Sequence, residues 1–415
     1  MDTQRVTRHL LVPLILSLTG SAAAADFGDP LDGLSADEQQ RFADGLAAFE
    51  EIETAADGLG PIFNGTSCAG CHNVGATGGG SATVETRFGT LIDGVFDPLV
   101  EFGGSLIQKD GIGVQGACTF SGEVVPPEAT IFAERRTTPL FGLGLVDAVP
   151  DGTFAALARA QARRTPATAG RPNMVIDVTT GHLVVGKFGW KGQVPNLLQF
   201  SADAYLNEMG ITTPLFPDEN CPQGDCSLLA CDPVPGVDDD LEDVTLFRDF
   251  MSFLAPPPRL RMPTTAATRD QRADNRPTDR AAHRRDTLAE MVSARGDRLF
   301  AQMGCANCHV RSLTSGDSPV TSLRFRTFQP YSDFLLHDMG ELGDGIEQGE
   351  ATGREMRTAP LWGLRLLTTF LHDGRAHTIE DAILAHDGQA GGARDRFAAS
   401  SATERAQLIA FLRTL

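Results

Sequence analysis

The stretch Cys68-Ala69-Gly70-Cys71-His72 recurs once in the chain, as Cys305-Ala306-Asn307-Cys308-His309. Two cysteines at this spacing, followed directly by a histidine, are typical of the covalent attachment of a c-type haem. The two thiols add to the haem vinyl groups, and the adjacent imidazole, His72 or His309, becomes the proximal ligand of the iron. A redox dithiol or half of a zinc site also uses paired cysteines, but two pairs that each continue into histidine favour haem. The sequence therefore predicts two covalently bound haem c groups.

The first 24 residues have the composition of a signal peptide. Arg5 and Arg8 supply a positive start, an apolar run covers residues 10–18, and Ala22-Ala23-Ala24 offers a small-residue cleavage site. The apolar run is shorter than the ~20 residues that a membrane-spanning helix needs. We therefore expect a periplasmic protein whose mature chain has no membrane span. Covalent haem attachment takes place in the same compartment.

Four cysteines lie outside the two haem motifs, namely Cys118, Cys221, Cys226 and Cys231. In an oxidising compartment this even number predicts two disulfides, for which three pairings exist. A metal site is the rival interpretation, but no histidine lies among the last three cysteines. The sequence therefore favours disulfides and leaves their pairing open.

The length and charge of the chain limit the classes of partner. With 415 residues the chain is long enough for two or three domains. Its formal net charge of −19 argues against nucleic acid or an anionic membrane surface as a partner. A basic electron donor or a neutral small substrate fits such a field better.

Hydrophobic periodicity and capping signals predict a mainly α fold. Helices are expected at residues 35–54, 152–164, 240–254, 287–302 and 402–415, with loops and short strands over residues 73–150. We predict two cytochrome c-like haem domains from an internal duplication, the first of them enlarged by loops and short strands. The expected boundaries are a signal peptide at 1–24, an N-terminal haem domain with an insertion at 25–258, a linker at 259–286 and a C-terminal haem domain at 287–415.

A second internal repeat supports the duplication. Residues 136–143, Arg-Thr-Thr-Pro-Leu-Phe-Gly-Leu, match residues 357–364, Arg-Thr-Ala-Pro-Leu-Trp-Gly-Leu, at six of eight positions. The arginines that open the two copies, Arg136 and Arg357, are predicted partners of the haem propionates, because a guanidinium group pairs bidentately with a carboxylate.

The same alignment suggests that the two irons differ in their second axial ligand. Residues 192–199 match residues 374–381, and extending this match sets Ala204 opposite His386. An imidazole can ligate iron and a methyl group cannot, so His386 is the predicted partner of His309 in a six-coordinate C-terminal haem.

The N-terminal haem is then predicted to have an open face. Two residues near Ala204 are rival ligands of its iron, Tyr205 and Met209. An open face permits chemistry at the iron, whereas a second ligand makes a pure electron carrier.

These features resemble the bacterial di-haem cytochrome c peroxidases, the related di-haem enzyme of methylamine utilisation and, most closely, the di-haem oxidoreductase family. The matching stretches include residues 60–72, 187–212, 330–340 and 357–388. The resemblance implies a peroxidatic N-terminal haem that receives electrons from the C-terminal haem. It also sets His386 where the peroxidases have a distal methionine, and histidine at that position should lower the reduction potential.

Three residues of the N-terminal domain match functional positions of the family. The resemblance implies that Trp190 is the inter-haem tryptophan, Gln199 the distal glutamine and Glu208 the acid/base glutamate. A carboxylate over an open haem can take a proton from peroxide and return it to the departing oxygen. The alternatives are a core aromatic for Trp190 and a solvated carboxylate at a helix end for Glu208.

We therefore predict an enzyme, a periplasmic di-haem c-type oxidoreductase of peroxidase type. It would reduce peroxide at the N-terminal haem, and a small cytochrome or cupredoxin is the expected external electron donor. Two other functions stay open: a non-catalytic di-haem electron-transfer cytochrome, or a di-haem oxidase or oxygenase of a protein or organic substrate. Iron ligation by Tyr205 or Met209 would support the electron carrier. The sequence neither requires nor excludes Ca2+ as a further cofactor.

Overall fold

The computed structural model describes residues 26–260 and 291–415, so the predicted signal peptide and most of the predicted linker lie outside the described residues. The helices are α1 (Ala36–Glu50), α2 (Cys68–Cys71), α3 (Leu143–Asp147), α4 (Asp151–Arg164), α5 (Leu197–Met209), α6 (Glu242–Phe253), α8 (Ile379–Leu384), α9 (Gly391–Ala398) and α10 (Ala402–Leu412), and residues 291–302 are also helical. Within these residues no helix is both long and apolar enough to cross a membrane.

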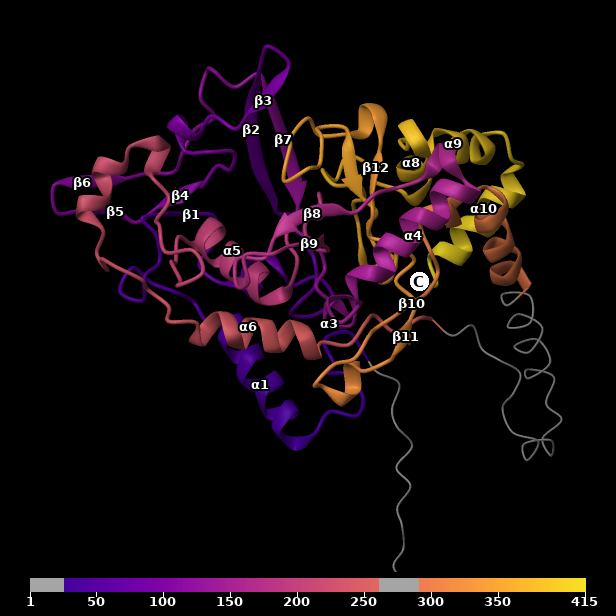
Figure 1. The fold of residues 1–415 in the computed structure, drawn as a ribbon, viewed down its shortest axis with the longest axis horizontal. Helices are drawn as coiled ribbons and strands as arrows, with labels where there is room; N and C mark the ends of the chain where they lie inside the picture. Colours follow the sequence, from indigo (N-terminus) through magenta and orange to yellow (C-terminus); the bar gives the residue numbers. More distant parts are fainter. Residues whose placement is uncertain (1–25, 261–290) are drawn as a thin grey trace, which may run out of the picture.

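Short antiparallel strands accompany the helices and form six small sheets in the described part of the chain. The strands are β1 (Ile62–Phe63), β2 (Val84–Ile92), β3 (Val95–Asp97), β4 (Asp110–Gly111), β5 (Gly113–Gln115), β6 (Cys118–Phe120), β7 (Ile131–Arg136), β8 (Asn173–Ile176), β9 (Leu183–Gly186), β10 (Leu313–Thr314), β11 (Thr327–Phe328), β12 (Leu336–Asp338) and β13 (Glu355–Arg357). The three-stranded sheet β3-β2-β7 rises above the helices of the first part of the fold, residues 26–260 (Figure 1). The expected short strands between residues 73 and 150 are therefore present.

The first helix begins where the sequence predicts and ends earlier. The Ser35 side chain accepts a hydrogen bond from the backbone of Glu38, and the Glu38 side chain accepts one from the backbone of Ser35, which forms the expected capping box. The helix stops at Glu50 because Glu51 is already extended. The predicted end at residue 54 was therefore about one helical turn too late.

In the first part of the fold, α1 crosses α6 (Figure 1). Gly45 makes this crossing close, since a Cβ there would lie 2.4 Å from the carbonyl oxygen of Leu246. Phe49 of α1 packs against Phe250 of α6, with ring centroids 4.9 Å apart, and it also contacts His72 of the first motif at 6.0 Å. The helix crossing thus supports the predicted proximal histidine from behind.

The second part of the fold, residues 291–415, repeats this close helix crossing. A Cβ on Gly296 would lie 2.2 Å from the carbonyl oxygen of Gln407 in α10, so the helix over residues 291–302 also crosses its partner closely. Phe300 packs against Phe411 at 5.6 Å and against His309 at 6.4 Å. The aromatic support of His309 therefore has the same form as that of His72.

The two parts exchange backbone hydrogen bonds reciprocally. The N–H of Arg136, at the end of β7, donates to the carbonyl of His372 (2.7 Å), and the N–H of Arg357, at the end of β13, donates to the carbonyl of Trp190 (2.9 Å). Each repeated arginine therefore contacts the loop of the opposite part. This reciprocity sets Trp190 and His372 at the junction between the two predicted haem sites.

Those two loops have the same form. Isolated bridges join Phe188 to Val194 and Phe370 to Ala376, and each loop leads into a helix whose N-cap side chain accepts a hydrogen bond from the third helical residue. The N-caps are Asn196 for α5 and Thr378 for α8. Residues 192–199 and 374–381, which match in the sequence, therefore also have similar backbone geometry.

The four remaining cysteines form two disulfides, as predicted. Cys118 pairs with Cys231 and Cys221 pairs with Cys226, so one bridge spans 113 residues and the other only 5. Both lie in the first part, where the long bridge ties β6 to the segment that precedes α6.

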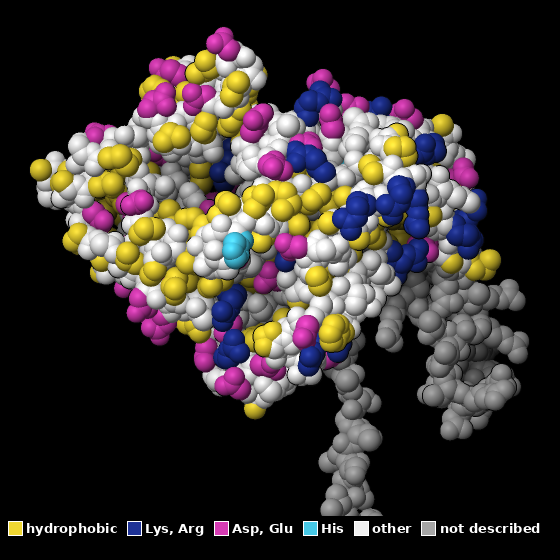
Figure 2. All heavy atoms as spheres, in the orientation of Figure 1, with side chains coloured by type: hydrophobic (Ala, Val, Ile, Leu, Met, Phe, Trp, Pro, Cys, Tyr) yellow, Lys and Arg dark blue, Asp and Glu magenta, His cyan; other side chains and the backbone are white. Residues whose placement is uncertain are grey.

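The charge of the surface is uneven. Figure 2 shows Asp and Glu side chains scattered over the visible face, whereas Lys and Arg gather over the region of α4. Arg159, Arg163 and Arg164 of α4 are exposed. The net negative charge therefore leaves a local basic area on this face.

Candidate active site at the first Cys-x-x-Cys-His motif

The first motif forms a single helical turn that holds both cysteines and the histidine. Ser67 caps α2 by accepting a hydrogen bond from the N–H of Gly70 (3.1 Å). Cys68 and Cys71 are free thiols, and burial raises the pKa of Cys68 to about 12. His72 Nδ1 lies 3.1 Å from the carbonyl oxygen of Gly79. A carbonyl can only accept, so Nδ1 carries the proton and Nε2 keeps a free lone pair for a ligand.

The second motif has the same chemistry. Cys305 and Cys308 are free, and the Nδ1 of His309 donates to the carbonyl oxygen of Tyr331 (2.9 Å). Burial lowers the pKa of His309 to about 4, as it does for His72, and for His309 the neighbouring His386 adds to the effect. Both imidazoles are therefore neutral at pH 7, which is the form that binds a metal.

A cavity of about 200 Å³ opens beside the first motif. Its lining includes Cys68, Cys71, His72, Ala204, Glu208 and Trp190. The thiols and the imidazole therefore face the same space as the predicted acid/base residue. Free cysteines and a neutral histidine at one side of a cavity are the donor set that a covalently held haem requires.

The two repeated arginines fit partners for haem propionates. Arg136 is buried and lines the cavity, and its Nε has no hydrogen-bond partner among the described residues. Arg357 is also buried, and its guanidinium donates to the backbone carbonyls of Gly189 (2.6 Å) and Thr358 (3.0 Å). Burial lowers the pKa of both, to about 10 for Arg357. A buried cation held mainly by carbonyls is costly, so an added carboxylate at either site would be favourable.

Glu208 shares the cavity with a second carboxyl group, Glu85 of β2. Burial and the nearby Glu85 raise the pKa of Glu208 to about 8, while its carboxylate accepts a hydrogen bond from the Asn64 side chain (2.9 Å). Burial opposes ionisation of Glu85, but Arg87 outweighs it, with Nε 2.9 Å from the Glu85 carboxylate, and keeps the pKa of Glu85 below its usual range. At neutral pH the pair therefore holds one proton, which resides on Glu208.

A third acid lies beside this pair. Asp203 lines the cavity, and burial raises its pKa to about 6, although Arg87 counteracts part of the shift. No motif in the sequence pointed to Glu85, Arg87 or Asp203. The alternation Glu85-x-Arg87 in a short strand was the available signal, because alternate strand residues point to the same face.

Ala204 and His386 occupy equivalent places in the two parts of the fold. Ala204 follows the N-cap of α5 at the same distance along the chain as His386 follows the N-cap of α8. The Nδ1 of His386 donates to the carbonyl oxygen of Ala382 (2.7 Å), which leaves its Nε2 free. Burial lowers the pKa of His386.

The rival ligands of the first site are engaged elsewhere or packed in the core. The hydroxyl of Tyr205 lies 2.8 Å from the Glu53 carboxylate and 3.3 Å from that of Asp243. Burial and these carboxylates raise the pKa of Tyr205, so the phenol stays protonated. Met209 is buried in the main hydrophobic cluster and contributes to the cavity wall.

The remaining two predicted residues have different surroundings. Trp190 lines both this cavity and a smaller one between the two parts, and its Nε1 donates to the carbonyl oxygen of Arg136 (3.0 Å). The side chain of Gln199 instead bonds to the backbone of β8 and the residues after it, with its oxygen accepting from Val178 (3.0 Å) and its nitrogen donating to Ile176 (3.3 Å). The structure thus brings Glu208 and Trp190 to the cavity and ties Gln199 to a neighbouring strand.

The described residues contain no group of three or more His, Cys, Asp or Glu side chains suited to hold a metal ion. The single histidines of the two motifs are not such groups, because a haem iron needs only its axial ligands from the protein.

Comparison with known proteins gives distant structural likenesses and one family. Hydrazine synthase from Kuenenia stuttgartiensis, pressurized with 20 bar xenon, aligns over 100% of both chains with 12% identity and a TM-score of 0.41. A MauG-like protein associated with microbial copper homeostasis aligns over 95% of this chain and 94% of its own with 15% identity and a TM-score of 0.38. No curated protein matches the chain. Residues 126–228 and 277–415, more than half of the sequence, match the family described as "Di-haem oxidoreductase, putative peroxidase", and the chain belongs to this family of haem enzymes.

Proposed function

We propose that this oxidoreductase is a periplasmic di-haem c-type peroxidase that arose by internal duplication. It would reduce hydrogen peroxide to two molecules of water, a reaction that consumes two electrons and two protons. Peroxide would bind in the cavity beside the first motif, and an external donor would supply electrons through the second haem. The observation that carries the proposal is that Glu85 and Glu208 line the same cavity as the first motif, where their neighbours move the two pKa values apart.

The chain's own residues would hold both haems. Cys68 and Cys71 would bind the first haem covalently, and Cys305 and Cys308 the second, with His72 and His309 as proximal ligands. When bound, each haem supplies a redox-active iron. The free thiols and the unused Nε2 atoms of both histidines support this assignment. Arg136 and Arg357 would pair with propionates, which would give the unpartnered Nε of Arg136 an acceptor.

The carboxyl pair would move the protons. Ionised Glu85 can accept a proton from peroxide, and protonated Glu208 can give its proton to the oxygen that departs as water. Arg87 keeps Glu85 ionised, and Asn64 orients the Glu208 carboxyl group. Two adjacent carboxyl groups with separated pKa values thus provide an acid and a base in one cavity.

The two sites would differ in ligation. His386 would be the second axial ligand of the C-terminal haem, because its Nδ1 is used by Ala382 and its Nε2 is free. Ala204 at the equivalent place cannot ligate, and the Tyr205 hydroxyl already has carboxylate partners. The N-terminal site would therefore stay open to peroxide.

Electrons would pass between the sites through Trp190, which lines the first cavity and lies at the junction of the two parts. A small cytochrome or cupredoxin would deliver them. The periplasmic location is supported by two disulfides, since such bonds persist in oxidising compartments.

Electronic absorption and EPR spectra of the ferric di-haem protein, recorded with and without peroxide, test this function. We expect one high-spin and one low-spin haem, a spectral change on adding peroxide, and peroxide consumption with a reduced donor. Two low-spin haems that respond to neither peroxide nor cyanide, in both the ferric and the half-reduced protein, would instead identify an electron carrier. Spectral change without peroxide turnover would direct the search to oxidation of a protein or organic substrate.

A further inference from the structure

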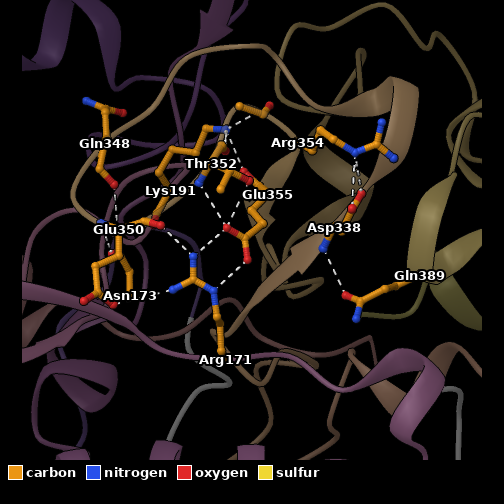
Figure 3. A network of polar contacts seen from close by, with 11 residues as sticks. Arg171, Asn173, Lys191, Asp338, Gln348, Glu350, Thr352, Arg354, Glu355 and Gln389 are labelled. Carbon is orange, nitrogen blue, oxygen red and sulfur yellow. Dashed lines mark hydrogen bonds and ion pairs between the residues drawn. The ribbon is translucent and has the colours of Figure 1, made fainter. Parts of the chain in front are cut away.

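Lys191, the residue after Trp190, is fully buried at the junction between the two parts of the fold. Its Nζ donates to the backbone carbonyl oxygens of Thr352 (3.0 Å), Gly353 (3.4 Å) and Glu355 (2.6 Å). It also lies 2.8 Å from the Asp344 carboxylate, which is itself fully buried. Figure 3 shows the Lys191 side chain directed into the loop that carries Thr352 and Glu355. One nitrogen therefore faces four oxygen atoms, all from the second part.

The surrounding atoms require the charged form of Lys191. Each of the four oxygens is an acceptor, and an ammonium group has three protons to donate and no lone pair. A neutral amine would direct its lone pair at a carbonyl oxygen. Burial lowers the pKa of Lys191, but Asp344 opposes this effect, and the positive neighbours of Asp344 keep the pKa of that carboxyl below its usual range.

Two arginines of the first part hold the oxygen cluster in place. The Asp344 carboxylate also accepts from the Nε of Arg135 (2.8 Å), the residue before Arg136. Figure 3 shows a second ion pair nearby, between Arg171 and Glu355. Two guanidinium nitrogens of Arg171 donate to the two carboxylate oxygens of Glu355, at 2.7 and 2.6 Å. The four oxygens would therefore keep their positions if the lysine side chain were shortened.

Backbone carbonyls and a carboxylate converging on one point are the ligand set of a hard cation such as Ca2+. Calcium itself does not fit here, because it takes six to eight oxygens at about 2.3–2.6 Å, whereas this cluster offers four oxygens at hydrogen-bond distances with the ammonium at their centre. We propose that the Lys191 ammonium is a built-in cation that replaces a bound metal at this junction and holds Trp190 between the two sites. Removing the ammonium would then leave a vacant cation site.

Two substitutions at one position test this inference in the di-haem protein. Lys191→Ala removes the charge and opens space, and Lys191→Met removes the charge but fills the space. We expect both to lower Tm by about 10 °C, since the buried Asp344 carboxylate loses one of its two cationic partners and the three carbonyl oxygens lose their donor. Millimolar ammonium chloride should restore at least about half of the loss in Lys191→Ala, and so should CaCl2, because water can enter the space left by the side chain and complete the calcium coordination. Neither salt should restore Lys191→Met.

Lys187→Ala is the matched control, because Lys187 is also buried, but its Nζ donates to the backbone carbonyl of Asp147 (3.0 Å) and lies 3.6 Å from the Asp151 carboxylate, both in the first part. Its Tm should not respond to either salt beyond the response of the wild type. A Lys191→Ala variant whose Tm ignores both cations would overturn the inference. Elemental analysis of the wild type gives a separate test if Lys191→Ala does not fold, because calcium bound at this junction at one ion per chain, lost with EDTA together with stability, would also overturn it.

Discussion

The indole ring of Trp190 lies edge-on to the imidazole ring of His372, with ring centroids 6.2 Å apart and an interplanar angle of 73°. The two residues occupy equivalent places in two loops of the same form. Each loop begins with a phenylalanine, Phe188 or Phe370, whose backbone forms a bridge six residues further along. Their carbonyl groups accept hydrogen bonds from Arg357 and Arg136 respectively. This pair of rings is therefore one of the contacts between the wall of the first cavity and the second part of the fold.

Replacing Trp190 with phenylalanine should slow electron transfer between the haems. Phenylalanine keeps an aromatic ring but loses the indole N–H that donates to the carbonyl oxygen of Arg136. Its smaller ring also makes less contact with His372. The ferric spectra of both haems should stay unchanged, because neither predicted iron ligand is altered. Stopped-flow absorption of the half-reduced protein mixed with peroxide measures the oxidation rate of the second haem.

Trp362→Phe is the control for this variant, since the chain has two tryptophans and Trp362 packs against Phe328 at 5.9 Å. An oxidation rate that falls equally in both variants would show a general packing effect rather than a route through Trp190.

Glu208→Gln should lower the rate of peroxide turnover by about 10²–10⁴-fold, the usual contribution of a positioned acid or base. The wild-type rate should fall by about tenfold per pH unit above about pH 8, because the pKa of Glu208 is raised to about 8 and its proton is lost there. Glu208→Gln should lack this alkaline limb. Steady-state rates between pH 5 and pH 10 measure both effects.

Glu219→Gln is matched to this variant, because burial raises the pKa of Glu219 to about 9 and it is not among the residues of the cavity wall. Its rate and pH profile should equal those of the wild type. An unchanged alkaline limb in Glu208→Gln would assign the titrating group to another residue.

His386→Met should raise the reduction potential of the C-terminal haem by on the order of 0.1 V, because methionine ligation favours ferrous iron relative to histidine. The first haem should keep its potential, since Ala204 rather than His386 occupies the equivalent place beside it. A spectroelectrochemical titration of the di-haem protein separates the two potentials. His182→Met, in an exposed turn, should leave both unchanged.

The two disulfides should differ in their contribution to stability. The Cys118–Cys231 bridge closes 113 residues and the Cys221–Cys226 bridge only 5. Loop-closure entropy then gives about 5 kcal/mol for the long bridge and about 2 kcal/mol for the short one. Urea unfolding of the double variants Cys118→Ala/Cys231→Ala and Cys221→Ala/Cys226→Ala compares them. A larger loss from the short bridge would contradict the entropic account.

Local patterns were sufficient for the elements that depend on neighbours in the chain. The capping box at Ser35 and the periodic apolar face predicted α1, although the helix ends at Glu50. The two Cys-x-x-Cys-His motifs and the matching octapeptides at Arg136 and Arg357 predicted a repeated organisation, and the even number of other cysteines predicted the two disulfides. Each of these signals lies within one turn, one helix or one composition count.

Only the tertiary structure decided which distant residues meet. The pairing of Cys118 with Cys231 and the meeting of Glu85 with Glu208 join segments far apart in the sequence, and no local pattern selects such partners. The same holds for Lys191, whose four oxygen partners come from residues 344–355. Burial sets the charge state of such groups, because the cost of a buried charge depends on every atom packed around it. That packing exists only once the whole chain has folded.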